Sequence, residues 1–128
     1  MRAPDCVEQV RPCISCNQGC VGGLLTSPRL GCAVNPAVGA ELMLAEDLIV
    51  STKEPKKVLV IGGGPAGMEA ARMAALSGRH VTLLAARPKL GGNINISKLA
   101  PRLKTLADIT IWQEQERYRL GVEVQHLC

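Results

Sequence analysis

The chain has 128 residues, 47% of them apolar, and Trp112 and Tyr118 are its only aromatic side chains. This length leaves room for one small domain and excludes two independent cores. The formal net charge of +4 is spread along the chain without a basic stripe, which argues against nucleic-acid binding. No run reaches the roughly 18 apolar residues of a membrane span, and residues 1–12 lack the apolar run of a secretory signal. We therefore expect a cytoplasmic protein that binds neither nucleic acid nor membrane.

The chain changes character near its middle. Residues 1–39 are rich in Cys, Gly, Pro and Asn with little periodicity, which predicts irregular structure. Residues 41–50 read as a short helix or an extended segment, and periodicity does not decide between them. We expect a cysteine-bearing segment over residues 1–50, a polar linker over 51–57 and a regularly folded part over 58–128.

The second part alternates predicted strands and helices. Strands are predicted over residues 58–61 and 80–84, because both are short apolar runs with β-branched residues. Helices are predicted over the Ala-rich residues 65–77 and over residues 99–120, whose Leu, Ile and Trp recur at helical spacing. A third strand begins at Val122. The predicted fold class is α/β, with a parallel sheet that forms half of a Rossmann-like domain.

Four cysteines carry the most specific chemistry of the sequence. Cys13, Cys16, Cys20 and Cys32 follow the spacing C-x2-C-x3-C-x11-C. Three thiols within eight residues can converge on one centre and the fourth arrives from a loop, which is the ligand count of a cubane iron–sulfur cluster. A zinc site uses the same four thiolates, although it more often pairs two C-x2-C units.

The cysteine spacing alone favours the cluster and leaves zinc, or disulfides and free thiols, as alternatives. Cys6 and Cys128 lie outside the pattern and are predicted to be ordinary thiols.

The second motif is Gly62-Gly63-Gly64-Pro65-Ala66-Gly67, which fits G-x-G-x-x-G between a predicted strand and a predicted helix. In this motif the first glycine permits a tight turn, the second lets a pyrophosphate approach, and the third lets the helix pack closely on the strand. The helix amino terminus then faces the phosphates with the positive end of its dipole. The motif predicts a dinucleotide site, against the alternative of a purely structural turn.

An acidic residue is expected about 20 residues after the glycine loop, at the end of the second strand, where it holds ribose hydroxyls. The sequence has Ala85, Ala86 and Arg87 there and no carboxylate. Arg87 could instead meet a ribose 2′-phosphate, and the alternative is that it is simply solvated.

The motifs occur in an order that resembles one protein family. The stretch RPCISCNQGC, then CAVNPAVG, KKVLVIGGGPAGMEAARMAALSGRHVTLL, LGGNIN and LGVEV is similar to the centre of NADH:flavin oxidoreductases of the 2,4-dienoyl-CoA reductase, enoate reductase and trimethylamine dehydrogenase type. The resemblance covers nearly the whole chain.

Several expectations follow from this resemblance. It implies a [4Fe-4S] cluster on Cys13, Cys16, Cys20 and Cys32, and FAD or ADP on the glycine loop with contacts from Gly92 and Asn93. It also implies electron transfer between NAD(P)H, FAD, the cluster and FMN. The FMN and substrate barrel and the NAD(P)H domain of the family have no counterpart in these residues, so FMN would be held by a further domain or a partner subunit.

Two other interpretations stay open at this stage. One is a zinc-stabilised nucleotide-binding module without a redox role. The other is an inactive truncated gene product, which the missing carboxylate at Ala85 makes credible.

Overall fold

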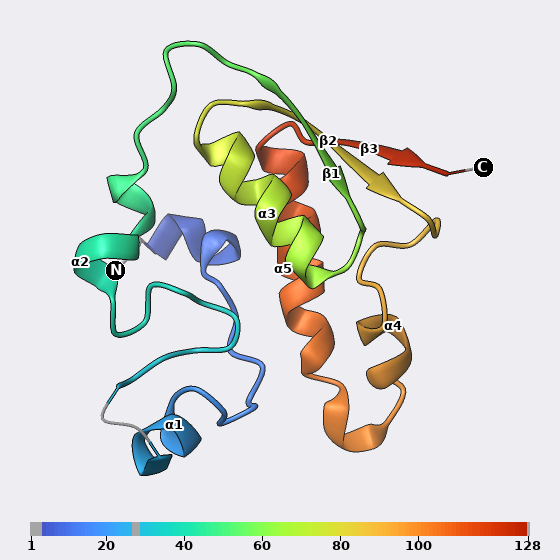
Figure 1. The fold of residues 1–128 in the computed structure, drawn as a ribbon. Coiled ribbons are helices and arrows are strands. Elements are labelled where there is room, and N and C mark those ends of the chain that lie inside the picture. Colours follow the sequence, from blue (N-terminus) through green and yellow to red (C-terminus); the bar gives the residue numbers. More distant parts are fainter. Residues whose placement is uncertain (1–3, 27–28, 128) are drawn as a thin grey trace.

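The computed structural model describes residues 4–26 and 29–127. In this structure two long helices lie along a small parallel sheet, and an irregular amino-terminal segment runs beside the helices (Figure 1). The α/β prediction with a partial Rossmann-like parallel sheet is confirmed.

Three strands form the sheet in the order β1-β2-β3. They are β1 (Lys57–Ile61), β2 (His80–Ala85) and β3 (Glu123–His126). Both pairings are parallel, with Val58 opposite Val81 and Leu83 opposite Val124. Parallel neighbours require crossover connections, and the two long helices provide them.

Helix α3 (Pro65–Leu76) connects β1 to β2, and α5 (Leu106–Arg119) leads into β3. Helix α3 begins with proline at its first position, where the missing N–H costs nothing and the fixed φ suits a helix. Its carboxyl end is followed by Gly78, whose φ of 80° is a conformation that glycine adopts without strain. Both ends therefore lie within one residue of the prediction.

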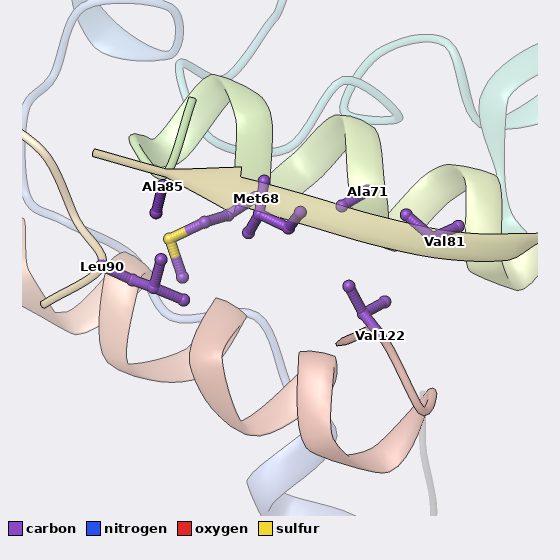
Figure 2. Packing of buried hydrophobic residues seen from close by; sticks show 7 residues of the cluster. Met68, Ala71, Val81, Ala85, Leu90 and Val122 are labelled. Carbon is purple, nitrogen blue, oxygen red and sulfur yellow. The ribbon is translucent and has the colours of Figure 1, made fainter. Parts of the chain in front are cut away.

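The apolar core lies between the sheet and α3. Val81, Leu83 and Ala85 point from alternate positions of β2 into this layer, where they meet Met68 and Ala71 of α3. Figure 2 shows the Met68 side chain directed towards Leu90 and Ala85 near the end of β2. The buried apolar residues are mostly small or aliphatic, as the composition requires.

The predicted helix over residues 99–120 is wrong at its start. The structure has a short helix α4 (Ile94–Ser97), a 3-10 turn η3 (Pro101–Leu103) and only then α5 from Leu106. Pro101 explains the difference, because a proline disfavours helical backbone at the residue before it and donates no hydrogen bond. Leu99 is largely exposed and does not belong to the apolar face of α5.

Where the structure describes it, the amino-terminal segment is irregular apart from four short helical pieces. These are η1 (Pro4–Gln9), α1 (Val21–Thr26), α2 (Glu41–Leu44) and η2 (Glu46–Leu48). The alternatives for residues 41–50 resolve into two single helical turns with extended backbone between and after them. None of the helices in residues 4–26 and 29–127 is long and apolar enough to cross a membrane.

One face of the sheet has no covering element among residues 4–26 and 29–127. Leu59 and Ile61 of β1 are 59% and 75% exposed, on the side opposite to α3. Parallel sheets are normally covered by helices on both faces. The uncovered face is thus an apolar surface on which further protein can pack.

Leu83 and Leu59 provide a matched test of this layer arrangement. Leu83→Ala should lower the free energy of unfolding by about 2–5 kcal/mol, because it leaves a cavity in the core. Leu59→Ala on the uncovered face should change it by less than about 0.5 kcal/mol. Urea unfolding followed by circular dichroism measures both, and equal losses would contradict the assigned core.

Candidate functional site

The glycine loop joins β1 to α3 as the motif predicts. Gly62 has a φ of 121°, which favours glycine, and its N–H donates to the Leu84 carbonyl at 2.8 Å. A side chain on Gly67 would overlap the Gly62 carbonyl oxygen. The third glycine is therefore needed so that the first turn of α3 can lie against the loop.

Gly64 is the residue before α3, and its surroundings are open. A Cβ built on Gly64 would have no heavy atom within 4 Å, and no side chain caps the helix there. Backbone N–H groups at such a helix start can face an anion. The open space at Gly64 fits the close approach of a pyrophosphate that the motif predicts.

A pocket of about 220 Å³ lies over this loop. The structure brings Gly92 and Asn93 to the same pocket, and the Gly91 N–H donates to the Gly63 carbonyl at 2.7 Å. The pocket is lined by Gly62, Gly63, Gly64, Ala85, Ala86, Arg87, Lys89, Gly92 and Asn93. Four of the predicted cofactor-binding residues thus share one pocket, with Gly67 in the helix turn beneath the loop.

Pro65 and Ala66, the other predicted cofactor contacts, line a second cavity. This cavity has a volume of about 570 Å³ and is mostly apolar. Its opposite wall is formed by Ile14 and by the loop that carries Cys32. The start of α3 and the cysteine segment therefore face one common space.

The cysteine segment has two local features that suit thiolate ligands. The Ser15 N–H points at the Cys13 Sγ at 3.3 Å, and Ser15 and Asn17 have φ values of 56° and 54°. Left-handed residues inside a short run turn successive N–H groups towards one side, which forms an anion-binding concavity.

The loops that carry the third and fourth cysteines lie in contact. The Gly31 N–H donates to the Gly19 carbonyl at 2.9 Å, and a Cβ on Gly19 would lie 2.9 Å from the Cys32 nitrogen. Backbone next to Cys20 and backbone at Cys32 are thereby held together, although 11 residues lie between the two cysteines.

The four thiols are not gathered into a closed site. In residues 4–26 and 29–127, no three His, Cys, Asp or Glu side chains converge closely enough to hold a metal ion. Cys13 is exposed, while Cys6, Cys16, Cys20 and Cys32 are half-buried, and all five are free thiols. Cys128 lies outside the described residues. The four-cysteine site remains a prediction.

A stack of two arginines on one tryptophan joins the cysteine segment to the helices. The guanidinium of Arg11 lies 4.5 Å from the centre of the Trp112 ring, and that of Arg72 lies 4.7 Å from it. Arg11 also donates to the Val34 carbonyl at 2.6 Å, close to Cys32 in sequence. The residues around Cys13 and Cys32 are thus tied to α3 and α5.

Three carboxylates balance these two arginines. Glu46 Oε1 lies 3.2 Å from Arg11 and 2.5 Å from Arg72, and Glu69 Oε1 contacts the same two guanidiniums. Glu116 pairs with Arg72 at 3.0 Å and also with Arg119. Arg72 is only 1% exposed, so its charge depends on these partners.

The pKa values of two of these carboxyls are lowered. Burial by itself would raise the pKa of Glu46, but hydrogen bonds and charge from Arg72 and Arg11 outweigh burial. Burial would also raise the pKa of Glu116, but the hydrogen bonds and charges of Arg119 and Arg72 lower that pKa below its usual range. Both carboxylates are held in their charged form.

Gln113 connects this network to the glycine loop. Its side-chain N–H groups donate to the Pro65 carbonyl and to Glu69, each at 3.1 Å. No motif of the sequence predicts this network, because its members come from the amino-terminal segment, α3 and α5. The pairs Glu69/Arg72 and Glu116/Arg119 at helical i,i+3 spacing were the available signal.

The fold is that of a partial Rossmann-like half-domain, with a pocket over its glycine loop and a cysteine segment attached. Residues 57–117 match the family described as FAD dependent oxidoreductase.

The similarity to individual proteins extends over almost the whole chain. The chain is 43% identical over 119 residues to an NADH oxidase of Thermoanaerobacter brockii, and the match covers 92% of this chain and 18% of that protein. The chain is also 42% identical over 121 residues to a cinnamate reductase of Clostridium sporogenes, and that match covers 94% of this chain and 18% of the reductase. Among solved structures, a 2-naphthoyl-CoA reductase complex matches with a TM-score of 0.84 and 34% identity, over 93% of this chain and 18% of that one.

The resemblance to NADH:flavin oxidoreductases is confirmed by these comparisons. The chain resembles an FAD-dependent oxidoreductase of the enoate reductase and NADH oxidase type, and it spans 18% of the length of the relatives it matches.

Two glycine variants separate the structural role of the loop from its binding role. Gly67→Ala should unfold the protein or cost several kcal/mol, because the new methyl group overlaps the Gly62 carbonyl. Gly64→Ala should fold normally, since its φ of −82° suits alanine and the space is open. We expect it to weaken nucleotide binding, because the methyl group occupies the space where a pyrophosphate would approach. Thermal melts and titration with FAD test both, and full binding by Gly64→Ala would contradict the assigned site.

The lowered pKa values predict loss of stability in acid. Glu46 and Glu116 stabilise the folded state above the ordinary glutamate pKa of 4.5, and this stabilisation is lost as the pH falls below it towards their folded values. The free energy of unfolding should fall steeply below about pH 4.5.

The double variant Glu46→Gln/Glu116→Gln isolates this contribution. Its free energy of unfolding should be lower than that of the parent at pH 7, and it should decrease less than that of the parent as the pH falls below about 4.5. Glu8→Gln, at an exposed position, serves as the control. Parallel curves for the parent and the double variant would rule out these two carboxyls as the cause.

Proposed function

We propose that this chain is the electron-transfer portion of an NAD(P)H-dependent flavin oxidoreductase. In this proposal the glycine loop and the 220 Å³ pocket hold the pyrophosphate and adenosine part of FAD. Cys13, Cys16, Cys20 and Cys32 hold a [4Fe-4S] cluster, which supplies one-electron transfer when it is bound. Electrons would pass between FAD and an FMN that is held outside these residues.

The observation that carries the proposal is the 570 Å³ cavity between the two motifs. Cys32 on one wall and Pro65 and Ala66 on the other place a candidate cluster ligand across a single apolar space from the start of α3. The side chains that line this space are mostly apolar, with Glu69 and Gln113 as its polar members. The Arg11 and Trp112 contact keeps the two walls together.

The residues of the cysteine segment suit the cluster chemically. Four thiols are available without disulfide bonds among the described cysteines, and the Ser15 N–H already faces the Cys13 sulfur. Hydrogen bonds to cluster sulfurs are one of the means by which a protein tunes such a centre. Binding would require Cys13, Cys16, Cys20 and Cys32 to close together around the metal, which couples cluster binding to folding of this segment.

The FMN-containing partner would pack beside the cysteine segment. Leu25 in α1, Leu42 in α2 and Val50 before β1 are 83%, 96% and 86% exposed. Exposed apolar side chains suit contacts with other protein. In this proposal an FMN barrel, as a further domain or a separate subunit, makes such contacts, with NAD(P)H as the ultimate electron donor.

Anaerobic reconstitution with iron and sulfide tests the cluster. The parent chain should gain close to four iron and four sulfide per chain and a broad visible absorption. Cys20→Ser should lose both, and it should also lose the rise in melting temperature that metal binding produces. Cys6→Ser, outside the spacing pattern, should behave like the parent. A colourless protein with one zinc and no sulfide would replace this proposal with a zinc-stabilised module.

FAD titration of the same preparations tests the second half of the proposal. Binding that depends on Gly64 supports a flavin role for the loop. If neither FAD nor ADP binds to a folded chain, the electron-transfer proposal fails and an inactive product is the better account.

A further inference from the structure

One arginine holds together the stretches that carry the first and the fourth predicted cluster ligands. The Arg11 side chain is only 9% exposed, and Arg11 lies two residues before Cys13. Its Nη1 donates to the carbonyl oxygen of Val34, two residues after Cys32, at 2.6 Å. The two stretches therefore meet at one guanidinium, although Cys13 and Cys32 are far apart in the sequence.

The other side of the same guanidinium is fixed on the two long helices. Its Nη2 lies 2.7 Å from Glu69 of α3, and the guanidinium carbon lies 4.5 Å from the centre of the Trp112 ring of α5. Pro12 is the single residue between Arg11 and Cys13. Because proline fixes its own φ and restricts the residue before it, the backbone at Cys13 follows the position of Arg11 with little freedom.

A second contact holds the turn between the first two predicted ligands. The Thr105 hydroxyl donates to the carbonyl oxygen of Ile14 at 3.1 Å. Thr105 is the residue before α5, and Ile14 lies between Cys13 and Cys16. Since Thr105 is exposed, loss of its hydroxyl leaves no buried polar group without a partner, and the fold should tolerate it.

These contacts act on the part of the chain that cluster binding must order. Closing four thiols around one centre fixes irregular backbone, which costs conformational entropy at every residue concerned. Contacts that already hold some of this backbone reduce the entropy that is lost when the group binds. Arg11 and Thr105 supply such contacts from α3 and α5.

We propose that Arg11 and Thr105 are positioning residues for the cluster. They hold the stretches around Cys13 and Cys32 on the two long helices, so that the four thiols close around one centre and stay closed. The inference rests on the proposed function, in which these cysteines bind a [4Fe-4S] cluster. It goes further by assigning retention of the cluster to two residues that are not ligands.

Release of iron to a chelator measures this role in the anaerobically reconstituted 128-residue chain. Arg11→Lys should release iron at least about tenfold faster than the parent, because one ammonium cannot contact the Val34 carbonyl and Glu69 together. Thr105→Val should release iron about threefold faster, because one hydrogen bond is lost. Thermal melts of the metal-free chains should show Thr105→Val unchanged, which separates positioning from general stability.

Electron paramagnetic resonance of the reduced cluster gives a second readout. The parent should show one set of g values. Arg11→Lys should show broadened lines, because the cysteine stretches no longer adopt a single geometry around the cluster. A variant that is merely less stable would lose signal intensity without a change of line shape.

Arg119→Lys and Thr52→Val are the matched controls. Arg119 belongs to the same charge network through Glu116, and the Thr52 hydroxyl donates to the Glu54 carbonyl at 3.2 Å. Both contacts are local in sequence, so these variants should release iron at the rate of the parent.

The outcomes separate this inference from the proposed function. If the parent binds iron and sulfide but Arg11→Lys and Thr105→Val release iron at the parent rate, or the controls release it equally fast, the positioning role is refuted and the cluster stands. If the parent gains neither iron nor sulfide, the cluster proposal fails and this inference falls with it.

Discussion

The contact of the Trp112 indole with the guanidiniums of Arg11 and Arg72 is the interaction on which the placement of the cysteine segment against α3 and α5 depends. Two cations beside one ring repel each other, so this contact needs the carboxylates of Glu46, Glu69 and Glu116 around it. Removing one partner from such a buried group typically costs about 3–5 kcal/mol, because the remaining charge is left without compensation. With two aromatic residues in the chain, this polar network provides the fixed geometry that a larger aromatic core would otherwise give.

The network also explains how two motifs that are distant in sequence come to share a cavity. Arg11 lies two residues before Cys13, and its partner Glu69 accepts a hydrogen bond from Gln113. Gln113 in turn donates to the Pro65 carbonyl, at the first residue of α3. A series of contacts thus runs from Arg11, two residues before the first predicted cluster ligand, to Pro65 at the start of α3.

The sequence predicted those parts of the fold that depend on local rules. The strands and α3 lie where short apolar runs, Pro65 and Gly78 place them. Gly62, Gly64, Gly92 and Asn93 line one pocket, and their binding of a cofactor stays a prediction. The leucine periodicity continues through Pro101 and therefore predicts a start for α5 that is too early. The network around Trp112 could not be predicted, because its energy arises from charges that three separate segments bring together. Nothing in the residues next to Arg72 in the sequence indicates that its side chain is buried.

The two ends of the pocket over the glycine loop are formed by different groups, backbone at one end and side chains at the other. At the glycine loop the contacts come from backbone, and the space at Gly64 and the packing at Gly67 depend only on the absence of side chains. At the end of β2 the pocket is lined by the exposed side chains of Arg87 and Lys89, on a loop that backbone hydrogen bonds hold in place. The residues after Ala85 can therefore change without disturbing the strand or the glycine loop. In the proposed function, the glycine loop supplies the space for a pyrophosphate and the residues after β2 surround the adenosine.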